Sequence, residues 1–208
     1  MTGKKFPVVF FPDRSNGGKR GGSGNDILDG GAGIDTADYS DATENLTVDI
    51  TDGTKFISAS QGTDTFKDIE GVIGGSGNDT LTGNKKANTL IGNAGNDILD
   101  GAGTAEALAG EYDYLDGGDN SDTVDYSYST NINGVTVDLK AGTGVIDASD
   151  SDTLVSFENV KGTNQNDTII LASTGALTGI ENKIDGLLGT DTVSYENYSA
   201  NLTIDMSA

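Results

Sequence analysis

Aspartate and glycine recur together at fixed spacing along the chain. Residues 21–29 read GGSGNDILD, 30–38 read GGAGIDTAD, 74–82 read GGSGNDTLT and 92–100 read GNAGNDILD. The shared nonapeptide is G-G-x-G-x-D-x-U-x, where U is a large apolar residue. Glycine adopts turn conformations and leaves carbonyl oxygens accessible, and aspartate adds a short carboxylate. A donor set made only of oxygen atoms favours Ca²⁺, so the spacing predicts calcium sites at the turns.

Weaker copies of the nonapeptide continue the pattern. They are 83–91 with Asn88 at the aspartate position, 101–109 with Glu106, the shortened copy 110–116 with Asp113, 117–125 with Asp122, 162–170 with Asp167 and 186–194 with Asp191. Together with the clear copies, they make residues 74–125 a nearly continuous run of six units. We therefore expect this stretch to form one regular block.

The nonapeptide also predicts the elements that position these side chains. GGxGxD forms a turn, and xUx forms a short strand with one inward side chain. Two nonapeptides complete one coil, so alternate turns stack on one edge and enclose carbonyl oxygens and two carboxylates. On this count Asp79 pairs with Asp97, and Asp97 pairs with Asp113.

The other edge is less regular in this count. Asn88, Glu106 and Asp122 stand there in place of a clean aspartate ladder, because Asn88 lacks a charge and Glu106 is longer by one methylene. Asp26 and Asp35 have no clear partner. We therefore expect a few firm calcium sites rather than one per nonapeptide.

A longer repeat is superimposed on the nonapeptides. DTADYS at 35–40 returns as DTVDYS at 122–127 and DTVSY at 191–195, and LTVDI at 46–50 returns as VTVDL at 135–139 and LTIDM at 202–206. DTFKDIEGVIGGSGNDT at 64–80 returns as DTLVSFENVKGTNQNDT at 152–168. Alternating apolar and polar residues in VDI and VDL predict strands.

These patterns divide the chain into four parts. Residues 1–20 are a basic N-terminal segment or a capping strand, and 21–73 are a first block with a strand-rich spacer. Residues 74–125 are the central block. Residues 126–208 are a second spacer with isolated nonapeptides and the start of a third long unit.

Composition excludes several classes of site. The 208 residues contain no Cys and no His, which removes thiolate and imidazole metal sites and histidine-based catalysis. The net charge of −21 argues against nucleic acid or an anionic membrane as a partner, and no apolar run approaches the ~20 residues of a membrane span. With 34% hydrophobic residues the chain is too polar to fold on apolar burial alone. No EF-hand or dinucleotide fingerprint is present, and we identify no catalytic residue.

The nonapeptides resemble the RTX (repeats-in-toxin, or haemolysin-type) calcium-binding repeat. The DTxDYS, LTVDI and DIExV segments resemble the spacers between RTX blocks in long bacterial surface and secreted proteins. The resemblance implies an all-β fold, a right-handed parallel β-roll or β-helix solenoid, with Ca²⁺ between successive turns on each edge. The positions that it implies for metal binding are Gly21, Ser23, Asp26, Gly30, Ala32, Asp35, Gly74, Ser76, Asp79, Gly92, Ala94, Asp97, Asp113, Asp122, Asp167 and Asp191.

The same resemblance implies a function and a location. The family is exported unfolded by type I secretion and folds when it meets calcium outside the cell. We therefore expect a non-catalytic calcium-binding module, secreted or at the surface of a bacterium, whose partners are several Ca²⁺ ions and the type I secretion machinery. Two alternatives stay open: the interaction surface of an adhesin that binds glycan or ice, and an accessory module of a larger secreted hydrolase or toxin.

Overall fold

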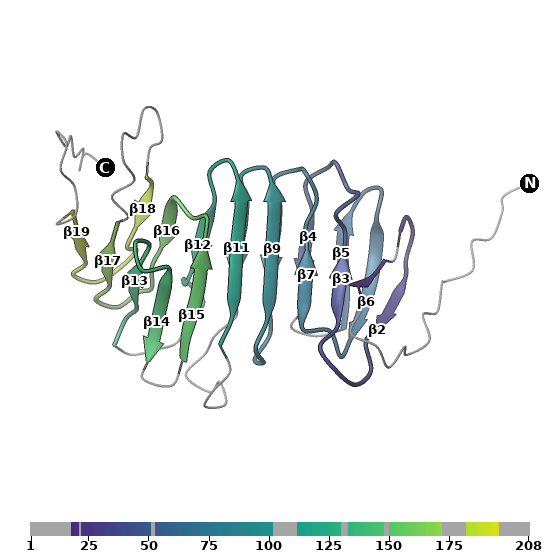
Figure 1. The fold of residues 1–208 in the computed structure, drawn as a ribbon, viewed down its shortest axis with the longest axis horizontal. Coiled ribbons are helices and arrows are strands. Elements are labelled where there is room, and N and C mark those ends of the chain that lie inside the picture. The colour runs from purple at the N-terminus through teal and green to yellow at the C-terminus, as the bar shows by residue number, and fades with distance from the viewer. Residues whose placement is uncertain are drawn as a thin grey trace, which may run out of the picture.

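The fold is a flattened coil of short strands, seen in a computed structural model that describes residues 18–20, 22–50, 53–101, 112–129, 133–147, 150–171 and 182–195. These residues contain strands and turns and no helix. Consecutive strands alternate between two faces, and strands on one face pair mostly in parallel (Figure 1). This arrangement is the predicted all-β parallel β-roll.

Three sheets make up the two faces. The ten-stranded sheet contains, in order, β1 (Gly18–Lys19), β3 (Thr36–Asp38), β7 (Gly71–Ile73), β9 (Thr89–Ala94), β11 (Tyr114–Asp119), β15 (Asp150–Val155), β14 (Thr143–Asp147), β13 (Thr136–Asp138), β17 (Thr168–Ile170) and β19 (Thr192–Ser194). The six-stranded sheet contains β18 (Ile184–Asp185), β16 (Asn159–Lys161), β12 (Thr123–Asp125), β10 (Ile98–Asp100), β8 (Thr80–Thr82) and β4 (Thr47–Asp49). The three-stranded sheet contains β2 (Ile27–Asp29), β6 (Gly62–Lys67) and β5 (Gly53–Ser58).

The core is a thin layer made by the U position of each nonapeptide. Leu81 of β8 and Leu99 of β10 are fully buried and lie in register, while the residues on either side of Leu81 are half-buried. Leu90 of β9 and Leu115 of β11 form the matching pair on the opposite face. Because each half-coil buries one such side chain, apolar burial per residue is small, and the turns must carry much of the stability.

Each long unit inserts an antiparallel hairpin into the coil. In the first unit β5 pairs antiparallel with β6, and β6 returns to parallel pairing with β2. In the second unit β14 pairs antiparallel with both β13 and β15, and β15 pairs parallel with β11. The DTF and DTL segments of the sequence therefore form the returning strand of a hairpin, which the sequence pattern did not predict.

The two inserts lie in different sheets although their sequences correspond. β4 of the first unit belongs to the six-stranded sheet, whereas the equivalent β13 belongs to the ten-stranded sheet (Figure 1). The strands from β7 to β13 alternate between these two sheets one by one. Six half-coils, β7 to β12, lie between the two inserts, and because the faces alternate, the second insert begins on the other face.

A buried tyrosine ties each insert to the roll. The Tyr39 hydroxyl donates to Asp64 Oδ2 at 2.6 Å, and the Tyr126 hydroxyl donates to Asp152 Oδ2 at 2.9 Å. The other oxygen of each carboxylate accepts a backbone N–H, from Asp26 at 2.9 Å and from Asp113 at 3.3 Å. The repeated DTxDYS motif thus supplies a hydrogen bond that holds the hairpin in register.

Some predicted segments lie outside the described residues. These are Gly21, Glu106, the LTIDM segment at 202–206 and all of the basic N-terminal segment except residues 18–20. Residues 18–19 form β1, which pairs in parallel with β3 at the end of the ten-stranded sheet.

Candidate metal centre

The nonapeptide aspartates lie in the turns, each just before a strand. Asp79, Asp97 and Asp122 precede β8, β10 and β12, and each exposes 1% of its surface or less. Ionised carboxylates are rarely buried to this degree unless they are paired or bind a metal. The other predicted aspartates that are buried are Asp26, Asp35, Asp113 and Asp167, while Asp191 is half-buried.

Stacked turns on one edge are joined by a ladder of carboxylates, which we name the Asp97 edge. Leu46 N donates to Asp79 Oδ1 at 2.9 Å, and Asp79 N donates to Asp97 Oδ1 at 2.7 Å. Asp97 N donates to Asp122 Oδ1 at 2.7 Å, and Asp122 N donates to Glu158 Oε2 at 3.0 Å. One oxygen of each acid therefore fixes the spacing between coils. The second oxygen of Asp79 accepts the Gly75 N–H at 2.7 Å, whereas those of Asp97 and Asp122 accept no hydrogen bond.

The opposite edge carries a second ladder, which we name the Asp113 edge. Asp35 N donates to Glu70 Oε2 at 3.1 Å, and Asn88 N donates to Asp113 Oδ1 at 2.7 Å. Asp113 N in turn donates to Asp152 Oδ1, which extends the ladder. Beyond the second insert, the N–H groups of Val135 and Asp167 donate to the Oδ1 atoms of Asp167 and Asp191, both at 2.9 Å. The isolated nonapeptides at 162–170 and 186–194 thus stack on each other.

The predicted pairing of Asp97 with Asp113 is wrong. Asp97 stacks on Asp122, and Asp113 lies on the other edge above Asn88. Residues 101–116 match two shortened or weak nonapeptides, but among the described residues β11 pairs directly with β9 and β12 pairs directly with β10. The described part of the central block therefore has five half-coils instead of the expected six, and Asp122 lies on the Asp97 edge.

Four acids that complete the ladders lie outside the nonapeptides and were missed. Asp64 is the partner of Asp26, and Glu70 is the partner of Asp35. Asp152 and Glu158 occupy the equivalent places in the second unit. The signal was present in the sequence, because DTFKDIE and DTLVSFE carry an acid at the same two positions.

The first glycine of each nonapeptide is required by the aspartate that follows it. A Cβ atom at Gly74 would lie 2.5 Å from Asp79 Oδ2 and 2.8 Å from the carbonyl oxygen of Gly92 in the next coil. At Gly92 the same clash would involve Asp97 Oδ2 and the Gly117 carbonyl. The glycine positions therefore mark points where a carboxylate oxygen and a carbonyl oxygen of two stacked turns converge.

The remaining predicted positions carry no carboxylate and offer backbone oxygens and the hydroxyls of Ser23 and Ser76. Gly30, Gly74 and Gly92 are buried, Ser23, Ala32 and Ser76 are exposed, and Ala94 is half-buried at the end of β9. In the described residues no three acidic side chains gather into a metal-holding group. A cation at these turns must therefore combine carboxylates with carbonyl oxygens, as hard Ca²⁺ does.

Two carboxylate oxygens on the Asp97 edge point to such a cation. Asp97 Oδ2 and Asp122 Oδ2 are buried and accept no hydrogen bond. Burial, with the charges of Asp79 and Asp122, raises the pKa of Asp97 to about 7. Burial, with the charge of Glu158, raises the pKa of Asp122 to about 6. Unsatisfied buried charges are costly, and a bound divalent cation would remove that cost.

The Asp113 edge is also under electrostatic strain. Burial and the charge of Asp152 raise the pKa of Asp113 to about 8. Burial likewise raises the pKa of Asp152 to about 7, against the hydrogen bond from Tyr126, which lowers it. These acids lie where the second insert joins the roll, so the junction gains stability when either a proton or a cation is present.

Comparison with known families agrees with this geometry. Residues 20–37 and 73–104 match the RTX calcium-binding nonapeptide repeat in four copies. These matches cover about a quarter of the chain and support a calcium-binding structural module. No curated protein matches the chain. The part of the chain that the structure describes has no helix long and apolar enough to cross a membrane.

Proposed function

We propose that this chain is a calcium-dependent folding module of a secreted or cell-surface bacterial protein. The single observation that carries the proposal is the pair of buried oxygens, Asp97 Oδ2 and Asp122 Oδ2, on adjacent turns of one edge. A Cβ atom at Gly92 would meet both Asp97 Oδ2 and the Gly117 carbonyl, and one at Gly117 would meet both Asp122 Oδ2 and the Ser156 carbonyl, so each turn offers a carboxylate together with a carbonyl of the next coil. Ca²⁺ takes six to eight oxygens at flexible geometry and suits this donor set.

Calcium binding and folding are one event in this proposal. The U-position core is thin and the charge is −21, so without cations the carboxylate ladders repel one another. Binding neutralises the ladders and links successive coils, and the binding free energy becomes folding free energy. A chain of this kind stays unfolded where free calcium is scarce, which suits export by type I secretion, and folds outside the cell.

Circular dichroism with and without calcium tests this proposal. We expect a coil spectrum in EGTA, a β spectrum in millimolar Ca²⁺, and full reversal when EGTA is added back. Mg²⁺ at the same concentration serves as the control, because its preference for octahedral geometry and retained water suits these turns poorly. A β spectrum that does not respond to EGTA contradicts the proposal.

An adhesin-type interaction surface is the second candidate. An ordered row of asparagine amides follows the exposed side of the Asp97 edge: Asn78 N donates to Asn45 Oδ1 and Asn96 N donates to Asn78 Oδ1, both at 2.9 Å. Ser121 N donates to Asn96 Oδ1 at 3.1 Å, which extends the row. A row of fixed amides offers evenly spaced donors to a glycan or to ice. Glycan arrays and thermal hysteresis on the calcium-loaded chain distinguish these ligands, and a null result in both excludes the candidate.

A further inference from the structure

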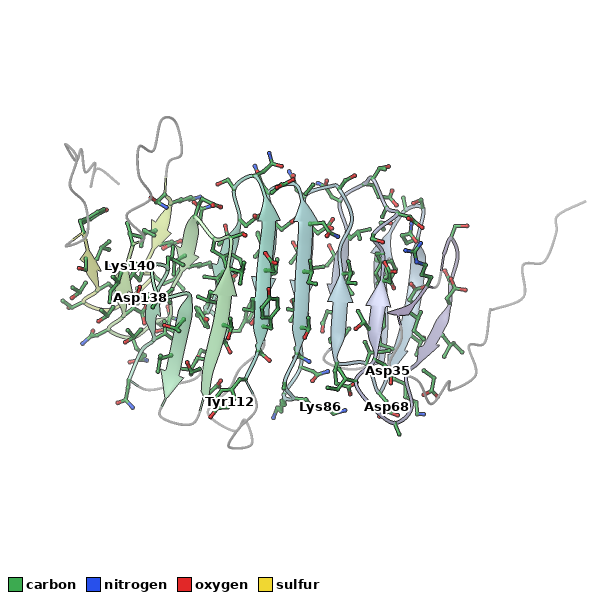
Figure 2. The ribbon with its side chains drawn as sticks, in the orientation of Figure 1. Asp35, Asp68, Lys86, Tyr112, Asp138 and Lys140 are labelled. Carbon is green, nitrogen blue, oxygen red and sulfur yellow. The ribbon has the colours of Figure 1, made fainter. Side chains whose placement is uncertain are left out.

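The turn at residues 83–88, GNKKAN, differs from the other turns of the central block in the groups that it offers. It lies on the Asp113 edge, between the Glu70 turn and the Asp113 turn, and Figure 2 shows Lys86 on the same edge of the roll as Asp35. The aspartate position holds Asn88, and the exposed positions between hold Lys85 and Lys86. This turn therefore brings a lysine ammonium and an amide to the places where the Asp97 turn has Gly95 and the Asp97 carboxylate; the amide at its second position, Asn84, has a counterpart there in Asn93, which donates to the Gly74 carbonyl at 2.7 Å.

Asn88 occupies the place of the missing aspartate. A Cβ atom at Gly83 would clash with Asn88 Oδ1, as one at Gly92 would with Asp97 Oδ2. The Asn88 amide nitrogen is directed at the previous coil and donates to the Glu70 carbonyl at 3.1 Å. At the equivalent place, Asp97 Oδ1 accepts the N–H of Asp79. The amide therefore reverses the direction of the hydrogen bond between the coils and leaves no charge to be neutralised.

Two further side chains of this turn bind the oxygens of the coil below. Lys86 Nζ contacts Glu70 Oε1 at 2.8 Å, and the Asn84 amide donates to the Ile69 carbonyl at 3.1 Å and the Ile50 carbonyl at 3.3 Å. Glu70 Oε2 accepts the N–H of Asp35, so both of its oxygens are bound by the protein. This contrasts with Asp97 and Asp122, each of which keeps one oxygen without a donor.

We infer that the turn at 83–88 supplies its own cation: the Lys86 ammonium and the Asn88 amide occupy the place that calcium takes at other turns. The inference rests on the proposed calcium binding and adds that this coil junction forms without metal. Calcium is then needed on the opposite, Asp97 edge, where no lysine reaches the ladder acids Asp79, Asp97 and Asp122 among the described contacts.

Restoring the motif should convert this turn into a calcium site. Asn88→Asp places a carboxylate oxygen against the Glu70 carbonyl, and Lys86→Ala releases Glu70 Oε1. The junction then holds two carboxylates and the carbonyl oxygens of Glu70 and Gly101 with no internal cation. These oxygens repel one another unless a divalent cation binds between them.

Calcium stoichiometry, measured by native mass spectrometry and by titration calorimetry on the full chain, tests the inference. We expect the double variant Lys86→Ala/Asn88→Asp to bind one ion more than the natural chain. Lys85→Ala, which removes the same charge one residue away, should bind the same number as the natural chain. The variant Asp97→Asn should bind one ion fewer than the natural chain, and this loss would show that the assay counts ions bound to the roll.

The outcomes separate this inference from the proposed function. If the natural chain binds no calcium, the proposed function fails. If Asp97→Asn loses an ion but the double variant gains none, the inference is overturned and the proposed function stands. If the double variant does not fold in calcium, Lys86→Gln decides: an unchanged ion count supports the inference, and the loss of one ion overturns it.

Discussion

Replacing Asp97 by Asn should have opposite effects on stability with and without calcium. The side chain has one oxygen bound by Asp79 N and one buried oxygen without a donor. Asparagine keeps an oxygen for the Asp79 N–H but loses the charge. With calcium present, the variant loses a carboxylate ligand. Without calcium, the same variant removes a buried charge that nothing compensates.

The magnitudes follow from the pKa and from binding linkage. A rise in the pKa of Asp97 from 3.8 to about 7 corresponds to at most about 4 kcal/mol against the ionised form, and about half of that after screening by water at the turn. A calcium ion at 100 times its Kd contributes about 2.7 kcal/mol to the folded state. Asp97→Asn should therefore cost about 3 kcal/mol in calcium and gain about 2 kcal/mol without it.

Urea unfolding in millimolar Ca²⁺ measures the cost expected with calcium. Folding induced by trimethylamine N-oxide in EGTA measures the gain expected without calcium, because this osmolyte strengthens burial without a metal. Asp116→Asn is the matched control, since Asp116 is a half-buried outward residue of β11 and carries the same charge. We expect the control to shift both midpoints little. Destabilisation of Asp97→Asn in both conditions would refute the reasoning, because it would show that the carboxylate stabilises the roll without calcium.

Three further perturbations test other parts of the structure. Gly92→Ala should destabilise the calcium-loaded chain by about 2–4 kcal/mol in urea unfolding, because its Cβ would clash with Asp97 Oδ2 and a carbonyl of the next coil. Without calcium, lowering the pH from 8 to 5 should increase the β structure seen by circular dichroism. The pKa of Asp113 is raised to about 8 and that of Asp152 to about 7 in the folded state. The folded state therefore binds more protons than the unfolded state and gains stability as the pH falls through these values. Tyr126→Phe should cost about 1–3 kcal/mol in thermal unfolding at fixed calcium, because Asp152 Oδ2 loses its hydroxyl donor, and an unchanged Tm would contradict the role given to this tyrosine.

The local structure could be predicted from the sequence because the residues within each nonapeptide determine its turn and its strand. The U position predicted buried residues such as Leu81 and Leu99, and the aspartate position predicted buried turn residues such as Asp79 and Asp97. Glycine at the first position is fixed by the aspartate five residues later, so this correlation is internal to one turn. Local rules of this kind need no knowledge of the rest of the chain.

The stacking order could not be predicted in the same way. Counting in nines assigned Asp113 to the wrong edge, because the residues between β10 and β11 do not follow a nine-residue spacing, while β11 pairs directly with β9 and β12 with β10. The hairpins were missed because their strands β6 and β15 read as spacers with an alternating pattern, and alternation does not specify a partner strand. Asp64 and Asp152 became ladder acids only once a hairpin brought them beside Asp26 and Asp113.

The donors that bind the ladder acids differ along the roll, and this explains how a strongly acidic solenoid limits its need for metal. Where an insert joins the roll, the ladder acid is held by a tyrosine hydroxyl, as Asp64 is by Tyr39 and Asp152 by Tyr126. Beside the first insert, Glu70 is held by the Lys86 ammonium. The regular coils between the inserts have no tyrosine or lysine donor for Asp97 and Asp122 among the described contacts. The second junction also keeps a cost of buried charge, because burial and Asp152 raise the pKa of Asp113 to about 8 although Tyr126 donates to Asp152. Calcium would then act on the central coils and on the second junction, and its removal should release both before the first junction, where Tyr39 and Lys86 supply the donors.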